Sequence, residues 1–318
     1  MESELLQPKS VWTATAQMPV YPPLSANITA EVCVIGAGLA GLTTAYLLAR
    51  QGVRVAVVEA LGLGSGETGR TTAHIATPDD RYRQIEEKYG AEAAKIVAAS
   101  FAAAIDLIEM TARTEQIDCG FERVDGYLYS CSEYPETTLR KELEAAQRAG
   151  VDVTLEEHVP VETLAEGPCL RFRNQGQFHP LRYLEGLAKA IERRGGVIFS
   201  GTRVVEVEER DGGVVVGTAT GKITADAAVV ATNTPFNERF AIHTKQNAYQ
   251  TYVVAALVKK GSLPRALIWD DADPYHYVRL APDIDAGHDL LIVGGADHKT
   301  GQEPDPDSHY RELEVWLR

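Results

Sequence analysis

The pattern of apolar and polar positions predicts a strand–helix–strand unit close to the N-terminus. Residues 31–35 form a short run rich in β-branched side chains, and residues 53–58 form another. Between them, residues 39–52 repeat their apolar positions every three or four residues and end in a glycine. Short apolar runs are typical of buried parallel strands, and the longer spacing is typical of an amphipathic helix.

Similar patterns continue along the rest of the chain and predict an α/β protein. Helical spacing recurs in residues 91–117, 135–149, 181–194 and 308–318, where Ser308 is a candidate N-cap. A strand is expected to end at His179-Pro180, and Gly221 is expected at the turn of a two-stranded ribbon. The strand patterns cover residues 121–131, 197–200, 203–209, 213–225, 227–232, 248–258, 266–271, 275–282 and 290–298.

These elements predict two domains, each formed by separate parts of the sequence. One is a Rossmann-type domain, in which helices cover a parallel sheet. The other is an α+β domain with a mostly antiparallel sheet. The expected division is an N-terminal arm (1–27), the Rossmann-type domain (28–85 and 176–243), the α+β or cap domain (86–175 and 244–306) and the start of a return helix (307–318).

Composition and charge exclude several classes of function. The net charge of −14 disfavours binding to nucleic acid or to anionic membranes. The sequence has no apolar run long enough to span a membrane and no secretory leader, so a cytoplasmic location is expected. No metal site is expected either, because the four cysteines form no C-x-x-C pair; Cys33 reads as a buried strand residue.

The first predicted turn carries a dinucleotide-binding fingerprint, G-x-G-x-x-G. In that fingerprint, Gly36 permits a tight turn, Gly38 lets the backbone approach a pyrophosphate, and Gly41 lets the helix pack closely. Glu59 follows the second strand, where a carboxylate can bind both ribose hydroxyls and repel a 2′-phosphate. Because strand, helix, second strand and acid occur in register, we expect a dinucleotide site that disfavours NADP.

The region after the second strand favours FAD over NAD as the dinucleotide. A loop rich in Gly, Ser and Thr (62–77) and a long helix pattern follow, instead of further strand–helix units. In four segments the chain resembles the FAD-dependent oxidoreductases of the D-amino acid oxidase, glycine oxidase and sarcosine oxidase superfamily. These segments are 32–60, 64–76, 178–208 and 225–235. The resemblance implies that the Rossmann-type domain is the FAD-binding domain and that the α+β domain is the substrate domain.

Residues 12–24 and the loop GETGRTTAHIA (66–76) sharpen this resemblance. Together they resemble a bacterial subgroup that carries a C-terminal Rieske [2Fe–2S] domain. The paired C-x-H and C-x-x-H boxes of that domain are not found in the chain. The resemblance therefore implies an iron–sulfur electron-transfer partner, and we expect the sequence to lack the part that closes the FAD-binding domain.

The resemblance also implies which residues contact FAD. Thr71 and Thr72 can reach phosphate or ribityl oxygens and Arg70 can offset phosphate charge, although the threonines could instead bond only their own backbone. Main-chain contact of Val204 with the adenine is equally compatible with an ordinary buried strand valine. The expected cofactor-binding residues are Gly36, Ala37, Gly38, Leu39, Ala40, Gly41, Glu59, Ala60, Gly66, Arg70, Thr71, Thr72, Ala73, His74, Val204, Ala231 and Thr232.

His74 is the sharpest catalytic candidate. Its context, T-A-H-I-A, resembles the loop of dimethylglycine- and sarcosine-dehydrogenase-like members, in which a histidine is covalently linked to the flavin. That histidine usually follows a Trp, whereas Ala73 stands here. Three interpretations remain open, namely a covalent link to FAD, a noncovalent flavin neighbour and a histidine that braces its loop.

Tyr275 and Tyr277 are the other catalytic candidates. They lie two residues apart in a predicted strand, so they share one face, and His276 faces the other way. The resemblance implies a tyrosine over the flavin, while half-buried aromatic packing is the alternative. Arg279 precedes the position of the family's carboxylate-binding arginine, so no such role is assigned to it.

Three functions fit these features. The first is oxidation of a C–N bond in a small amine or amino acid by hydride transfer to flavin N5, which requires no strong protein acid or base. The second is a flavin module that passes electrons from another donor to an iron–sulfur domain. The third is an FAD-binding fragment without catalysis.

Overall fold

The computed structural model describes residues 10–78, 81–133, 135–161, 164–234, 236, 247–281, 285–303 and 305–318. Unit 1 comprises Met1–Thr71, Met110–Gly120 and His179–Gln246, and unit 2 comprises Thr72–Glu109, Phe121–Phe178 and Asn247–Arg318. The start of the expected N-terminal arm (1–9) and the expected boundary between residues 243 and 244 lie outside the described residues.

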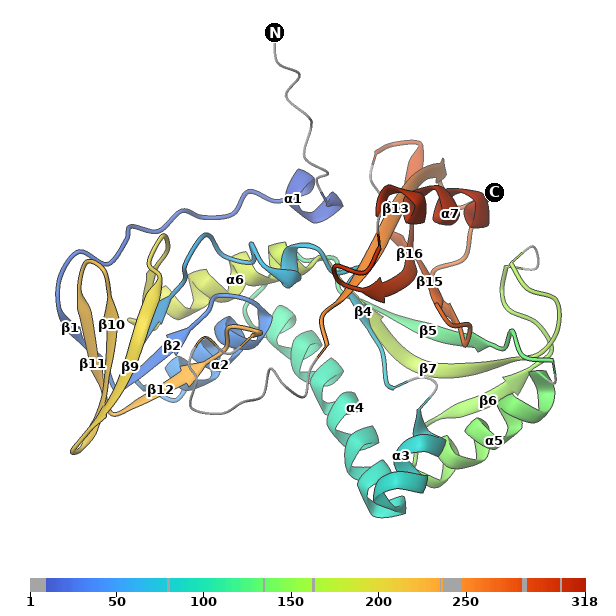
Figure 1. Ribbon diagram of the computed structural model, residues 1–318, viewed down its shortest axis with the longest axis horizontal. Coiled ribbons are helices and arrows are strands. Elements are labelled where there is room, and N and C mark those ends of the chain that lie inside the picture. The colour runs from blue at the N-terminus through green and yellow to red at the C-terminus, as the bar shows by residue number, and fades with distance from the viewer. Residues whose placement is uncertain are drawn as a thin grey trace, which may run out of the picture. The chain divides into compact units, whose positions relative to one another are not determined.

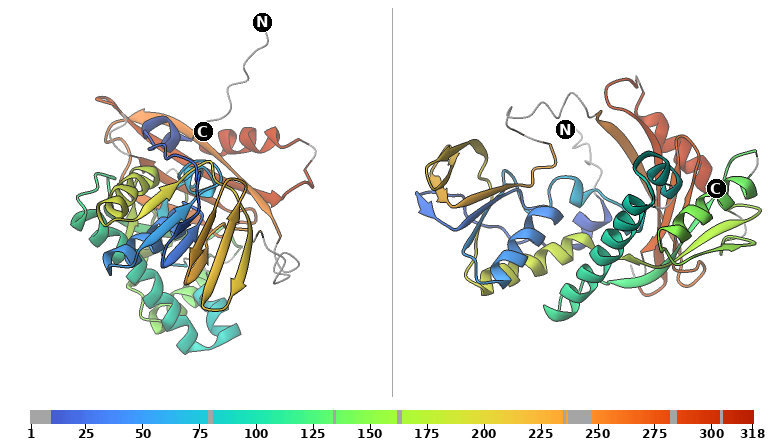
Figure 2. Two further views of the ribbon diagram at one scale, coloured as in Figure 1. Left: turned by 90° about the vertical axis from the view of Figure 1, so that its left-hand side faces the viewer. Right: turned by 90° about the horizontal axis from the view of Figure 1, so that it is seen from below.

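A four-stranded parallel sheet in the order β12-β2-β3-β8 forms the centre of unit 1. Helix α2 connects β2 to β3, and α6 lies beside α2 (Figure 2). Tyr46 of α2 and Leu184 of α6 are both fully buried, as the amphipathic spacing predicts. The bounds are β2 Val32–Ile35, α2 Leu39–Arg50, β3 Val55–Val58, α6 Pro180–Arg193, β8 Val197–Phe199 and β12 Ala227–Val230.

A second sheet of unit 1 packs against the first (Figure 1). Its order is β1-β11-β10-β9, and the ribbon of β10 and β11 turns at Gly221 as expected. Cys33 and Val58 from the parallel sheet share a buried cluster with Val216 and Ile223 from the second sheet. The bounds are β1 Ile28–Thr29, β9 Val204–Arg210, β10 Gly213–Thr218 and β11 Lys222–Ala225. Unit 1 also contains α1 (Val11–Thr15) and the 3₁₀ turn η1 (Glu67–Gly69).

Unit 2 contains a mostly antiparallel sheet of eight strands (Figure 1). Its main path is β13-β16-β15-β14-β5-β7-β4, β6 pairs with β7, and β14 and β5 run parallel. The strands are β4 His74–Ile75, β5 Glu122–Tyr129, β6 Val153–Glu156, β7 Cys169–Gln177, β13 Tyr249–Lys259, β14 Ala266–Asp270, β15 His276–Ala281 and β16 His288–Lys299.

Each face of this sheet is covered by helices of unit 2. Leu267 packs in one cluster with residues of α3 and α5, and the next residue, Ile268, packs in another with Leu313 of α7. Successive strand residues point to opposite faces, so α3 and α5 cover one face and α7 covers the other. The helices are α3 Tyr82–Tyr89, α4 Ala91–Thr114, α5 Pro135–Arg148 and α7 Asp307–Leu317, and the division between the units falls within α4.

The expected α/β fold class is confirmed, but two predicted element ends were wrong. Strand β7 ends at Gln177, and His179 instead caps α6, because its Nδ1 accepts a hydrogen bond from the N–H of Arg182. Ser308 is not the cap of α7. The helix begins one residue earlier, at Asp307, and the Ser308 hydroxyl donates to the carbonyl of Asp305.

Candidate functional site

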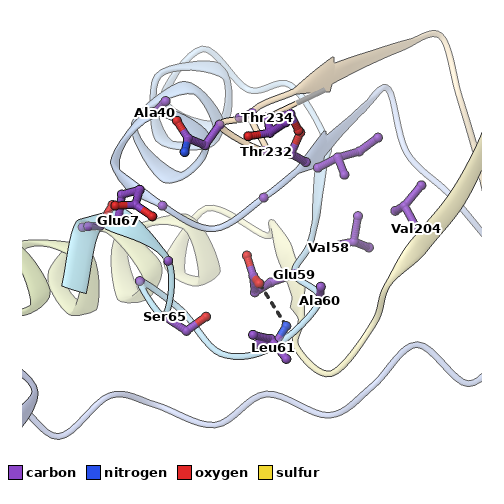
Figure 3. A pocket seen from close by; sticks show the side chains of 18 of the residues that line it. Ala40, Val58, Glu59, Ala60, Leu61, Ser65, Glu67, Val204, Thr232 and Thr234 are labelled. Atoms are coloured by element: carbon purple, nitrogen blue, oxygen red, sulfur yellow. Dashed lines mark hydrogen bonds between the residues drawn. The ribbon is translucent and has the colours of Figure 1, made fainter. Parts of the chain in front are cut away.

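A groove of about 490 Å³ lies in unit 1 at the carboxyl ends of β2, β3 and β12 (Figure 3). This edge of a parallel sheet is where open α/β folds bind ligands. The groove contains predicted cofactor residues from the glycine turn, the end of β3, the 66–76 loop, β9 and the end of β12. They are Gly36, Gly38, Leu39, Ala40, Glu59, Ala60, Gly66, Val204, Ala231 and Thr232.

The connection from β2 into the first turn of α2 admits only glycine at two positions. Gly36 has a φ of +107°, and a Cβ there would lie 2.5 Å from the carbonyl oxygen of Ala231. A Cβ on Gly41 would collide with the carbonyl oxygen of Gly36. Two of the predicted fingerprint residues, Ala37 and Gly41, do not line the groove. They are buried behind the turn and contribute to its packing.

The start of α2 suits an anionic group. Gly38 is the N-cap and brings no side chain to accept the first N–H groups of the helix, which have no partner within it. The Leu39 N–H is met by the hydroxyl of Thr68 at 3.2 Å, from the neighbouring loop. The partial positive charge of the helix start, open to the groove, favours phosphate.

Glu59 directly follows β3 and bonds to the backbone of the glycine turn and of its own loop. Its Oε2 accepts from the N–H of Ala37 at 2.8 Å, and its Oε1 accepts from the N–H of Leu61 at 2.9 Å. Figure 3 shows the second of these bonds as a dashed line. Each carboxylate oxygen can accept a further hydrogen bond, so the group can also receive ribose hydroxyls. A carboxylate with free acceptor positions here therefore fits the adenosine end of a dinucleotide.

The remaining predicted loop residues do not line this groove. Arg70 is exposed, and Thr71 accepts a hydrogen bond at its carbonyl from Nε1 of Trp12 at 2.6 Å. Thr72, Ala73 and His74 belong to unit 2. The loop is thus divided, with Gly66 at the groove and His74 in the sheet of the second unit.

A second cavity of about 770 Å³ lies within unit 2 and contains all three catalytic candidates. The ring of Tyr277 lies 5.4 Å from that of His74 and 5.5 Å from that of Tyr275, measured between centroids. His276 faces away, as expected, and stacks on Trp316. The other lining residues are Thr72, Ala76, Thr77, Pro78, Arg81, Gln84, Phe101, Trp269, Asp270, Ala272 and Asp273.

The imidazole of His74 is held at both nitrogens. Nε2 lies 3.3 Å from the carbonyl oxygen of Val278, which can only accept, so Nε2 carries the proton. Nδ1 lies 3.1 Å from the hydroxyl of Thr72, which then donates to it. Burial and, to a smaller extent, the charge of Arg279 together lower the pKa of His74 to about 3, against the opposing effect of the Val278 carbonyl. His74 is therefore neutral at physiological pH.

We expect His74 to make the protein lose stability as the pH falls from about 6.5 to about 4. The unfolded imidazole takes up a proton below about pH 6.5. The folded one does so only near pH 3, so the unfolded state binds the additional proton in this window. The free energy of unfolding should fall by up to about 1.4 kcal/mol per pH unit from this group. Urea melts of the natural protein and of His74→Gln would measure the difference.

The exposed His158 provides the control for that experiment. The variant His158→Gln should keep the pH dependence of the natural protein, whereas His74→Gln should flatten it. Equal slopes in all three proteins would contradict the low pKa of His74.

Several residues of both cavities were not predicted from the sequence. Thr68 and Ser65 lie in the loop rich in Gly, Ser and Thr (62–77), so that loop was the signal for them, although the sequence did not show its individual contacts. Arg81 reaches the second cavity from one segment, and Asp270 and Asp273 reach it from another. The two aspartates lie at or just beyond the end of the predicted strand 266–271, whereas the sequence pattern gave no signal for Arg81.

Among the described residues, no helix is both long enough and apolar enough to cross a membrane.

A strand–glycine turn–helix–strand unit, a carboxylate after the second strand and a groove at the carboxyl ends of parallel strands define a dinucleotide-binding protein. The model of the DAO family, described as FAD dependent oxidoreductase, matches residues 31–318. The chain therefore belongs to this family, and the expected resemblance is confirmed.

Two curated relatives align with two thirds or more of this chain. A Bacillus subtilis protein named as a Rieske 2Fe-2S iron-sulfur protein is 29% identical over 96% of this chain and 60% of its own length. The Escherichia coli gamma-glutamylputrescine oxidoreductase is 29% identical over 67% of this chain and 51% of its own length. The chain thus spans only about half to three fifths of these two relatives.

A solved structure supports the fold. The L-proline dehydrogenase from P. horikoshii superposes with a TM-score of 0.68 over 92% of this chain and 76% of its own, at 18% identity.

Proposed function

We propose that this chain is the FAD-binding part of an oxidoreductase that oxidises a C–N bond of an amine or amino acid. The observation that carries the proposal is the groove of unit 1, with Glu59 and the glycine turn, in a chain of the FAD dependent oxidoreductase family. The amine named for the Escherichia coli relative supports the substrate class.

The residues of the groove would hold the cofactor by its adenosine and pyrophosphate ends. The N–H groups at the start of α2 would receive the pyrophosphate, and Glu59 would receive the ribose hydroxyls. When bound, FAD supplies the redox chemistry of the reaction as the acceptor of a hydride at flavin N5. The protein contributes binding, orientation and exclusion of water.

We propose the cavity of unit 2 as the place where the substrate binds. It combines aromatic side chains with charges of both signs, from Arg81 and from Asp270 and Asp273. Such a lining suits a molecule that carries an amine and a carboxylate together. Tyr275 and Tyr277 would bound the substrate, and His74, neutral and fixed in one tautomer, would orient it without changing its own charge.

We further propose that His74 is not covalently linked to the flavin. A covalent bond requires a ring nitrogen with a lone pair available, and here Nε2 carries a proton while Nδ1 accepts from Thr72. After denaturing electrophoresis of the FAD-loaded protein, we expect no fluorescent protein band under ultraviolet light. A fluorescent band that disappears in His74→Ala would overturn this assignment.

Mixing the FAD-loaded chain with a panel of amines and amino acids under anaerobic conditions tests the proposed activity. We expect the flavin absorbance near 450 nm to bleach with some members of the panel, together with formation of a carbonyl product after imine hydrolysis. If FAD binds stoichiometrically and no member bleaches it, the chain is an FAD-binding module without this activity.

A second function is favoured by the Bacillus subtilis relative, whose name refers to a Rieske iron–sulfur protein. In that case the reduced flavin would pass its electrons to an iron–sulfur partner instead of dioxygen. Aerobic turnover distinguishes the two acceptors. Peroxide formed in equal amount to product indicates an oxidase, and substrate-dependent bleaching with little peroxide indicates transfer to another acceptor.

A further inference from the structure

Arg279 is a buried cation in β15 whose neighbours are mainly backbone carbonyls. Only 3% of its surface is exposed. Its Nη1 donates to the carbonyl oxygens of Ala73 at 2.8 Å, Thr72 at 3.0 Å and Phe178 at 3.4 Å. All four residues belong to unit 2, so this arrangement lies within one compact part of the protein.

The backbone that Arg279 holds has an uncommon conformation. Ala73 has a φ of +59°, in the left-handed region that residues with a Cβ seldom adopt, and its side chain is buried. Strained backbone of this kind persists only where surrounding contacts enforce it, and it is concentrated at functional sites. The hydrogen bonds from Arg279 to the carbonyls on both sides of the Ala73 nitrogen and Cα are such contacts.

Burial of this arginine carries a large desolvation cost. Burial lowers the pKa of its guanidinium to about 9, and the charge of Glu122 on β5 opposes this only in part. An apolar side chain would fill the position without that desolvation cost. A charged side chain in such a place indicates that its charge or its N–H donors are used, and here Nη1 donates to three carbonyls.

Arg279 controls the position of His74, the residue that follows Ala73 in the chain. The imidazole contacts Val278, which directly precedes Arg279 in β15, and Thr72, whose carbonyl Arg279 also holds. The ring of Tyr277, from the same strand, stands at 86° to that of His74. Loss of the arginine would therefore release Thr72 and Ala73, the two residues that precede the imidazole.

We propose that Arg279 is a positioning residue, which locks the left-handed turn at Ala73 and thereby fixes the imidazole of His74 in the cavity of unit 2. The effect on turnover rests on the proposed function of that cavity as the substrate site, and the effect on the loop does not. Among the described residues, the charged or titratable groups that act on His74 or share its cavity are Arg279, Tyr277, Tyr275, Arg81, Asp270 and Asp273, and Glu122 on β5 acts on Arg279.

Hydrogen exchange tests the effect on the loop directly. The full chain would be prepared with FAD as the natural protein, as Arg279→Lys, which keeps the charge without the fork, and as Arg279→Met. We expect exchange of the backbone amides in residues 72–76 to become at least about tenfold faster in both variants. Peptides from β5 and β7 away from this loop should keep their protection. If the Met variant does not fold, the Lys variant alone decides.

Arg171→Met is the matched control, because Arg171 lies in the same sheet and pairs with Asp125 at the surface. It should leave exchange of residues 72–76 unchanged. A role for Arg279 that is only structural would raise exchange throughout the sheet, without selectivity for this loop. Unchanged exchange at 72–76 in Arg279→Lys, or a rise that Arg171→Met reproduces, would overturn the proposal.

Titration of the His74 imidazole by NMR provides a second, independent readout. In Arg279→Met the pKa of His74 should rise from its low value toward about 6.5, because the neighbouring charge is lost and the loop opens to water. If amines are turned over, kcat should fall with KM little changed, and the combination with His74→Gln should add little. Absence of turnover in the natural protein would refute the proposed function, while exchange and titration would still decide the role of Arg279.

Discussion

Replacement of Gly41 by alanine is expected to weaken FAD binding severely. A Cβ at this position would collide with the carbonyl oxygen of Gly36, and neither atom can move without opening the turn between β2 and α2. Backbone oxygen cannot yield as the end of a side chain can, so we expect the dissociation constant to rise about 100-fold or more, equivalent to about 3 kcal/mol. Quenching of flavin fluorescence, or the flavin content of the purified protein, measures the loss.

Gly62→Ala is the matched control for this experiment. Gly62 lies in the same unit and close to the same groove, but a Cβ there would meet no atom within 4 Å. This variant should bind FAD as the natural protein does. Equal affinities for Gly41→Ala and Gly62→Ala would mean that the groove is not the cofactor site.

Replacement of Glu59 by alanine should weaken FAD binding about 10- to 100-fold. The carboxylate accepts from the backbone N–H groups of Ala37 and Leu61, and in the proposed complex it also accepts from the ribose. Hydrogen bonds to a charged group contribute about 1.5–3 kcal/mol each, which sets this range. Isothermal titration calorimetry with FAD measures the change in affinity.

Glu67 allows the effect of charge to be separated from that of position. Glu67 also lines the groove, on η1, so Glu67→Ala removes an equal negative charge from a different position in the same groove. We expect this variant to bind FAD as well as the natural protein or slightly better, because a charge that repels the phosphates is removed. Weakening by Glu67→Ala as severe as that by Glu59→Ala would contradict a specific role of Glu59 at the ribose.

The sequence predicted the β2–α2–β3 unit well because local rules determine it. A short apolar strand, a helical stripe and glycines at steric contacts each depend on residues that are neighbours in the chain. The structure places the fingerprint of Gly36, Gly38 and Gly41 at the groove or directly behind it, together with Glu59. In unit 2 the strands β5, β13, β14, β15 and β16 were also anticipated, since their alternation or apolar runs are local as well. Strands β4 and β6 were not predicted, and for β7 only an end was predicted, at the wrong residue.

The order of the strands in the sheets and the composition of the second cavity could not be predicted, because they depend on pairing between distant segments. The parallel pairing of β14 with β5 joins residues about 140 positions apart, and β1 joins β11 across almost the whole of unit 1. No periodic pattern encodes these partners. The cavity of unit 2 is assembled in the same way, from the segment after β4, the start of α3 and the end of β14.

Arg279 illustrates the same limit at the level of a single side chain. In the sequence it is one arginine in a strand, and its position disfavoured the role that the family resemblance would have suggested. Only the fold brings it beneath the carbonyls of Thr72 and Ala73, about 200 residues earlier in the chain. The left-handed conformation of Ala73 was equally hidden, since alanine carries no signal for it.

The central claim is that the groove of unit 1 binds the adenosine diphosphate half of FAD. Titration of the purified chain with FAD, in the presence of ADP or FMN as competitor, tests it most directly. We expect saturable, equimolar FAD binding that ADP displaces and FMN does not, because FMN lacks the half that the groove would hold. Absence of saturable binding, or displacement by FMN but not by ADP, would contradict it.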